Sequence, residues 1–140
     1  LDERHRVVQM AGMFQKEVAE RCTAKAGSKE YGILSVFLQA YYKVEYLFTV
    51  KAGAFNPPPK VLSGVIRMTR NDREQLNCDE KLFWRVVKAG FNQRRKTLRN
   101  SLSGVVPKDK MSDNPLYELR AERLTVDDFV GLTNEIANSL

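Results

Sequence analysis

The chain has 140 residues, of which 43% are apolar and 29% charged, so its composition is that of a globular protein rather than a disordered one. No apolar run approaches the ~18 residues that a membrane-spanning helix needs, which excludes a membrane protein of that kind. Its two cysteines are too few for a disulfide scaffold and favour a reducing, cytoplasmic setting. Because the chain begins with Leu1 rather than Met, we expect it to be a fragment.

The first half of the chain alternates between strand and helix patterns. Residues 6–14 are largely apolar and predict a strand that is covered on both faces. Good helix formers follow over 16–24, and apolar residues spaced three and four apart predict an amphipathic helix over 33–43. Alternation predicts a strand over 44–50, and residues 61–68 indicate another. This order predicts the second half of a layered α/β domain with a mixed sheet.

Only helical patterns follow this α/β part. We therefore place a boundary near residue 71, with an α/β part over 1–71 and a small all-helical domain over 72–140. Asn77 and Glu80 resemble a capping box, which predicts one long helix from about Cys78 through Leu102.

A last helix is expected to begin at Thr125. Asp128, three residues later, is placed to cap it, and Asp127 suits the positive end of the helix dipole. Its packed face should consist of apolar residues and one threonine: Val126, Phe129, Val130, Thr133, Ile136 and Leu140.

The positive charge of the chain, +6 in total, is concentrated in one stretch. Residues 81–110 carry a net charge of +8, whereas 1–80 carry +2 and 111–140 carry −4. No acidic residue lies between Lys81 and Asp109 to neutralise this stretch. On one continuous helix its cations would form a ridge, which predicts binding to RNA phosphates; a solvated helix face is the alternative. The RNA-binding candidates in this stretch are Arg85, Lys88, Arg95, Lys96 and Arg99.

Arg94 differs from these residues because it falls within the apolar stripe of the expected helix, between Phe91 and Leu98. A guanidinium group in such a place needs a partner. We favour a structural ion pair that holds the helix against the sheet domain, and direct contact with RNA is the alternative.

The sequence lacks several familiar site patterns. It contains no GxGxxG or P-loop motif that would cradle nucleotide phosphates. His5, Cys22 and Cys78 lack the spacing of zinc ligands, so we expect no metal site. The single histidine is far from either cysteine, so no nucleophile–base pair is evident. From these residues alone, the prediction is an RNA-binding α/β protein with a basic helical appendage.

Two segments, FNPPPKVLSGVIR (55–67) and AGFNQRRKTLRNSL (89–102), strongly resemble the small-subunit (16S) rRNA adenine N6-dimethyltransferase family, the dimethyladenosine transferases. Residues 13–50 look like the same family, and the resemblance extends over about 7–138. It implies the C-terminal half of a Rossmann-like S-adenosylmethionine methyltransferase domain, followed by a small helical rRNA-binding domain. The implied enzyme dimethylates two adjacent adenosines near the 3′ end of 16S rRNA on a precursor small ribosomal subunit.

The resemblance also implies roles for individual residues. The cofactor site is expected in the N-terminal half of the family's domain, so we expect no cofactor-binding residue here and no activity from this chain alone. Phe55 aligns with an aromatic residue thought to stack on the flipped-out adenine; a core plug is the alternative. Asn56 and Pro57 would support that ring, and Lys60 suits either a phosphate contact or a structural pair. A non-catalytic RNA-binding module for ribosome assembly is the second hypothesis for the whole chain.

Overall fold

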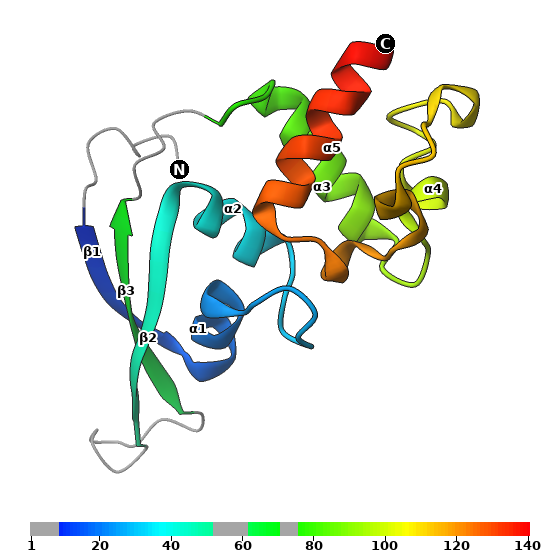
Figure 1. Ribbon diagram of the computed structural model, residues 1–140. Coiled ribbons are helices and arrows are strands. Elements are labelled where there is room, and N and C mark those ends of the chain that lie inside the picture. Colours follow the sequence, from blue (N-terminus) through cyan, green and yellow to red (C-terminus); the bar gives the residue numbers. More distant parts are fainter. Residues whose placement is uncertain (1–8, 52–61, 71–75) are drawn as a thin grey trace.

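The computed structural model describes residues 9–51, 62–70 and 76–140, whose helices and strands are shown in Figure 1. In this part of the chain, no helix is both long and apolar enough to cross a lipid bilayer. Four residues singled out from the sequence lie outside the described residues: Phe55, Asn56, Pro57 and Lys60.

Three strands form one antiparallel sheet, with the last strand of the chain in the middle. β1 (Gln9–Gln15) and β2 (Tyr42–Val50) both pair with β3 (Ser63–Arg70). Two helices, α1 (Lys16–Thr23) and α2 (Ile33–Tyr41), lie between these strands in the chain and pack beside the sheet. The predicted α/β class and the order of these five elements are confirmed. The strand directions differ from the expected mixed sheet, because all the described pairings are antiparallel.

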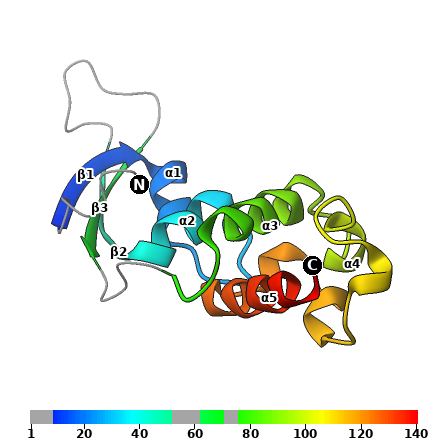
Figure 2. The same ribbon diagram turned by 90° about the horizontal axis from the view of Figure 1, so that it is seen from above.

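The alternation of side chains along β3 assigns them to two faces of the sheet. Ile66 and Met68 are buried on the face that the helices cover, whereas Val65 points to the opposite face with its cross-strand partners Met13 and Phe48. Met13 is 51% and Phe48 56% exposed. The prediction that the first strand is covered on both faces is therefore wrong for the described chain, because α1 and α2 lie on one side only (Figure 2).

The second half of the chain contains helices without strands in the part that the structure describes. Its two longer helices, α3 (Glu80–Asn92) and α5 (Val126–Ser139), pack against each other. Between them run the single turn of α4 (Leu98–Ser101) and three short 3-10 helices: η2 (Lys108–Lys110), η3 (Pro115–Glu118) and η4 (Ala121–Arg123).

The predicted continuous helix over 78–102 is wrong, because α3 ends at Asn92 and residues 93–97 form a turn. This turn has no apolar residue that would hold a longer helix against the core. The chain instead bends, so that the Leu98 amide donates to the Leu119 carbonyl at 2.8 Å and the Leu98 side chain is fully buried. A tertiary contact thus replaces the helical pattern that the sequence favours.

The residue that caps the start of α3 differs from the prediction, whereas the predicted start of α5 agrees with the structure. The N-cap of α3 is Asp79, whose carboxylate accepts from the Leu82 amide at 3.2 Å, and not the predicted Asn77. The predicted start of α5 at Thr125 with Asp128 is confirmed, and the structure shows that the cap is reciprocal: each side chain accepts from the other's backbone amide at 3.1 Å.

The packed face of α5 agrees with the sequence at five positions and differs at one, since Val126 and Val130 are partly buried against the core. Phe129, Thr133 and Ile136 are fully buried, but Leu140 is 60% exposed because it lies beyond the end of the helix. The residue missing from the prediction is Leu132, which is also fully buried.

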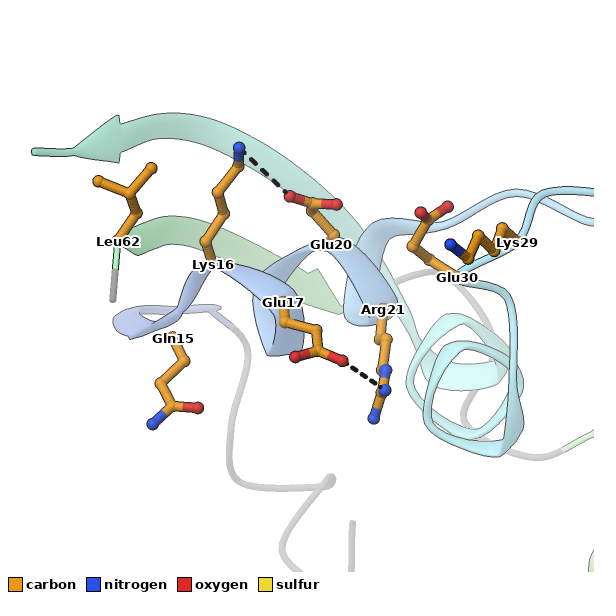
Figure 3. A pocket seen from close by; sticks show the side chains of 8 residues that line it. All are labelled: Gln15, Lys16, Glu17, Glu20, Arg21, Lys29, Glu30 and Leu62. Atoms are coloured by element: carbon orange, nitrogen blue, oxygen red, sulfur yellow. Dashed lines mark hydrogen bonds and ion pairs between the residues drawn. The ribbon is translucent and has the colours of Figure 1, made fainter. Parts of the chain in front are cut away.

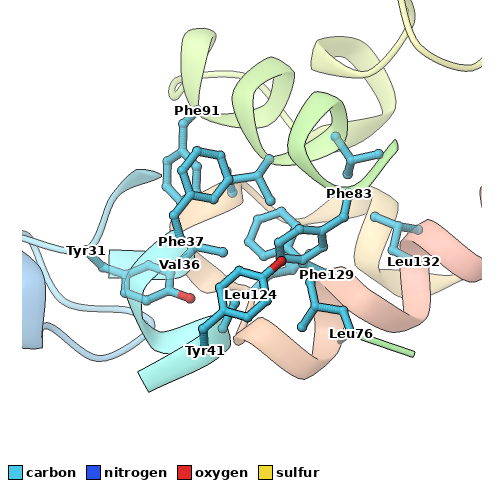
Figure 4. Packing of buried hydrophobic residues seen from close by; sticks show 14 of the residues in the cluster. Tyr31, Val36, Phe37, Tyr41, Leu76, Phe83, Phe91, Leu124, Phe129 and Leu132 are labelled. Atoms are coloured by element: carbon cyan, nitrogen blue, oxygen red, sulfur yellow. The ribbon is translucent and has the colours of Figure 1, made fainter. Parts of the chain in front are cut away.

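One hydrophobic core connects the two halves of the chain. Figure 4 shows Tyr31 and Phe37, from the first half, close to Phe83, Phe91 and Phe129 from the second. Tyr31 and Phe91 meet edge to face with ring centroids 6.1 Å apart, and Phe91 lies 5.9 Å from Phe129. The helical part is therefore fixed to the sheet part by shared burial, while the division at residue 71 stays a prediction.

Candidate nucleic-acid interface

The outer face of α3 carries exposed cations because the helix is amphipathic. Phe83 and Val87 are fully buried on its inner face, whereas Lys81, Arg85 and Lys88 are exposed. Among the described residues, no carboxylate lies within ion-pair distance of these three cations. This side of α3 therefore keeps its positive charge.

Lys88 contacts an aromatic stack on the same helix. Its ammonium lies 5.8 Å from the ring centroid of Trp84, which stacks on Phe37 of α2 with centroids 4.6 Å apart. This cation–π contact positions the lysine without neutralising its positive charge.

Arg95 and Lys96 lie in the turn after α3. Both are exposed, and within the described part of the chain neither has a carboxylate partner. The turn is closed by the Lys96 amide, which donates to the Gln93 carbonyl at 2.9 Å. The residues 91–96 line an open depression of about 560 Å³. The broken helix therefore presents these two cations from a bend rather than from a straight rod.

Arg94 faces the first half of the chain. Its guanidinium donates to the Tyr31 carbonyl at 2.8 Å and lies 5.6 Å from the ring centroid of Phe91. The contact connects the turn to the segment before α2, and its acceptor is a carbonyl rather than the partner carboxylate of an ion pair. The interdomain role of Arg94 stays a prediction, now with a defined contact.

Arg99 is partnered by an acid, unlike Arg95. Its Nε donates to Glu118 at 2.7 Å, its guanidinium lies 5.3 Å from the ring centroid of Tyr117, and its side chain is 33% exposed. Burial and Glu135 raise the pKa of Tyr117, and the charge of Arg99 lowers it. Nothing in the sequence indicates the pair with Glu118, because the two residues lie nineteen positions apart, in two separate short helices. RNA binding by Arg99 stays a prediction, with its charge already compensated in the fold.

A second depression, of about 480 Å³, lies beside α1 (Figure 3). Its charges are compensated, since Arg21 pairs with Glu17 at 2.7 Å and Lys16 with Glu20 at 3.7 Å. The Lys16 amide also donates to the Leu62 carbonyl at 2.8 Å, which anchors the start of the segment leading into β3. This depression has little net charge to attract a phosphate.

The described residues do not show a binding site for S-adenosylmethionine. The carboxylates beside α1 that could accept from ribose hydroxyls, Glu17 and Glu20, already pair with basic side chains. No group of three or more potential metal ligands occurs in residues 9–51, 62–70 and 76–140. We therefore assign no step of methyl transfer to the described side chains.

Comparison with known proteins gives consistent results. The family model described as "Ribosomal RNA adenine dimethylase" matches residues 1–139. The chain is 61% identical over 130 residues to "Ribosomal RNA small subunit methyltransferase A" of Bacteroides thetaiotaomicron, covering 92% of this chain and 49% of that protein. A protein of the same name from Cytophaga hutchinsonii is 57% identical, with 98% and 53% covered. The chain thus spans about half the length of the curated relatives it matches.

Two solved structures have a similar fold. A dimethyladenosine transferase from Plasmodium falciparum matches with a TM-score of 0.79 at 22% identity, covering 99% of this chain and 62% of that one. The 23S rRNA methyltransferase ErmE matches with a TM-score of 0.68 at 18% identity, covering 92% and 55%. At these identities the likeness concerns the fold.

Proposed function

Because the chain belongs to the ribosomal RNA adenine dimethylase family, we propose that it serves in the dimethylation of two adjacent adenosines near the 3′ end of 16S rRNA. The methyl donor in this proposal is S-adenosylmethionine, and the substrate is carried by a precursor small ribosomal subunit. The relatives named above are methyltransferases, so the alternative of a non-catalytic assembly module is not favoured. A cytoplasmic location belongs to the same proposal.

In this proposal the described residues bind and orient the RNA. The observation that carries it is the set of exposed cations without acidic partners among the described residues: Lys81, Arg85, Lys88, Arg95 and Lys96. Phosphate neutralisation with counterion release supplies a large share of nucleic-acid affinity. Four of these residues were expected from the sequence, and Lys81 lies on the same face of α3.

Target recognition in this proposal depends on Phe55. An adenine must leave its stack before an enzyme can reach N6, and an aromatic platform offsets part of that cost, worth about 1–3 kcal/mol per stacked base. Asn56 and Pro57 would support the ring, and Lys60 would contact a phosphate. The described strands β2 and β3 flank this segment and are paired up to Val50 and Ser63. The described residues on either side of the segment, Val50 and Ser63, are therefore held opposite each other as cross-strand partners.

A chimera tests the proposal. Residues 1–139 would replace the matching part of the Bacteroides thetaiotaomicron relative, and N6,N6-dimethyladenosine in undermethylated small-subunit RNA would be measured by mass spectrometry after nuclease digestion. We expect dimethylation by the chimera and its loss in a Phe55→Ala chimera that still binds the RNA, with Phe48→Ala on the exposed sheet face as control. A chimera that folds and binds RNA without methylating it would contradict the proposal.

A further inference from the structure

The segment after α4 is a fixed, basic part of the surface, and its lysines are not among the individual RNA-binding candidates chosen from the sequence. Figures 1 and 2 show it at the end of the molecule opposite the sheet. Val106 is fully buried on one side of η2, and Met111 is partly buried on the other. Between these anchors, Lys108, Asp109 and Lys110 are all exposed. The turn thus presents two lysines from a backbone that is held at both ends.

Hydrogen bonds hold the rest of the segment in place. Asn114 donates to Glu135 of α5 at 2.6 Å, Ser112 donates to the same carboxylate, and the Lys110 amide donates to the Pro107 carbonyl at 2.9 Å. A surface ordered in this way has little conformational entropy left to lose when it binds a partner.

Lys108 is held against α4 by a side-chain hydrogen bond. Its ammonium donates to the side-chain oxygen of Asn100 at 2.9 Å, and the Asn100 amide donates to the Thr97 carbonyl at 3.0 Å. The ammonium group of Lys108 is thereby held at α4, which begins two residues after Lys96. Because Asn100 is neutral, the hydrogen bond orients Lys108 without compensating its charge.

The charge balance of this region is one-sided. Residues 93–112 contain six lysines and arginines and one acid, Asp109. Of the six cations, Arg99 is compensated by Glu118, and Arg94 is directed to Tyr31. The remaining four, which lie on both sides of α4, are Arg95, Lys96, Lys108 and Lys110.

We propose that Lys108 and Lys110 form a second RNA-phosphate contact, which extends the cationic surface of Arg95 and Lys96 across α4. This inference rests on the proposed function for the identity of the partner as RNA. A polyanion bound at Arg95 and Lys96 before α4 would meet further uncompensated lysines after it, at Lys108 and Lys110.

Salt-dependent binding tests the contact. The probe is an RNA hairpin with the sequence of the 3′-terminal helix of small-subunit rRNA, and the affinity of the 140-residue chain is measured over a range of KCl concentrations. Lys108→Gln and Lys110→Gln should each reduce the slope of log affinity against log salt by about 0.7–0.9. Lys43→Gln, an exposed lysine on β2 at the sheet end, is the matched control and should leave the slope unchanged.

A variant of opposite sign strengthens the design. Asp109→Asn removes the carboxylate between the two lysines and should raise the affinity for the same hairpin. If both lysine variants bind like Lys43→Gln while Arg95→Gln and Lys96→Gln reduce the slope, the second contact is overturned and the proposed function stands. If the Arg95 and Lys96 variants also leave the slope unchanged, the proposed RNA interface fails with it. Thermal melts establish that each variant is folded.

Discussion

Arg95 and Arg99 provide the sharpest test of the interface, because the sequence gives them the same role and the structure gives them different environments. Arg95 is exposed without an acidic partner in the described chain, whereas Arg99 pairs with Glu118 at 2.7 Å and lies over Tyr117. Replacing each by Gln removes one positive charge and retains a polar side chain. We expect Arg95→Gln to change RNA binding and Arg99→Gln to change mainly stability.

The magnitudes follow from these contacts. The Arg99–Glu118 pair is partly exposed, so after solvent screening it contributes about 0.2–1 kcal/mol, and the contact with Tyr117 adds about 0.5–1 kcal/mol. A loss of about 1 kcal/mol lowers the Tm of a chain of this size by roughly 3–4 °C. Arg95→Gln should leave Tm nearly unchanged and reduce the salt slope of RNA binding by about 0.7–0.9.

The assays are thermal unfolding monitored by circular dichroism and fluorescence anisotropy with a labelled hairpin RNA at several salt concentrations. Glu118→Gln is the matched control: it breaks the same pair while leaving Arg99 charged and over Tyr117, so it should reproduce the part of the stability loss that is due to the ion pair, without weakening RNA binding. If Arg99→Gln reduces the slope as much as Arg95→Gln and leaves Tm unchanged, then Arg99 binds RNA and does not stabilise the fold, contrary to this prediction.

Three further predictions concern the fold. A Cβ at Gly64 would lie 2.8 Å from both the Ala19 Cβ and the Tyr46 hydroxyl, so Gly64→Ala should lower the free energy of unfolding in chemical denaturation by about 1–3 kcal/mol. Gly131 lies in open space on α5, so Gly131→Ala should instead raise it by about 0.5–1 kcal/mol. Similar effects of the two variants would contradict the packing. Thr125→Ala should destabilise by about 1 kcal/mol through loss of the α5 cap, and Thr125→Ser should restore most of it. Burial, and secondarily Asp128, raises the pKa of Tyr31 to about 12. The stability that the neutral Tyr31 side chain contributes is therefore complete below pH 10 and is lost as the pH rises toward 12. An ultraviolet titration that shows a pKa near 10 for this residue would refute the burial.

Much of the first half of the fold could be predicted, because strands and helices there have clear local patterns. The α2 helix and the β2 and β3 strands appear within a few residues of their expected positions. The faces of the sheet could not be predicted in the same way, since an apolar strand such as β1 shows only that its side chains can be buried. Which of its faces a helix covers depends on the path of the chain.

The interface was predictable in its residue types but not in its geometry. Charge counting identifies Arg85, Lys88, Arg95 and Lys96, and the structure leaves all four exposed. Charge counting could not separate Arg99 from them, because its partner Glu118 is distant in sequence and is brought close only by the tertiary fold.

The family, the element types, the α5 cap and the location of the positive charge could all be inferred from the residues alone, because each depends on residue identity or on neighbours within a few positions. The tertiary structure alone decided where α3 stops, which arginines are compensated and how Lys108 comes to face α4. Bending after Asn92 lets Leu98 reach the core and pair with Leu119, which a continuous helix would prevent. Burial and long-range hydrogen bonds made that choice, since the local helical preference of residues 93–97 was too weak to oppose them.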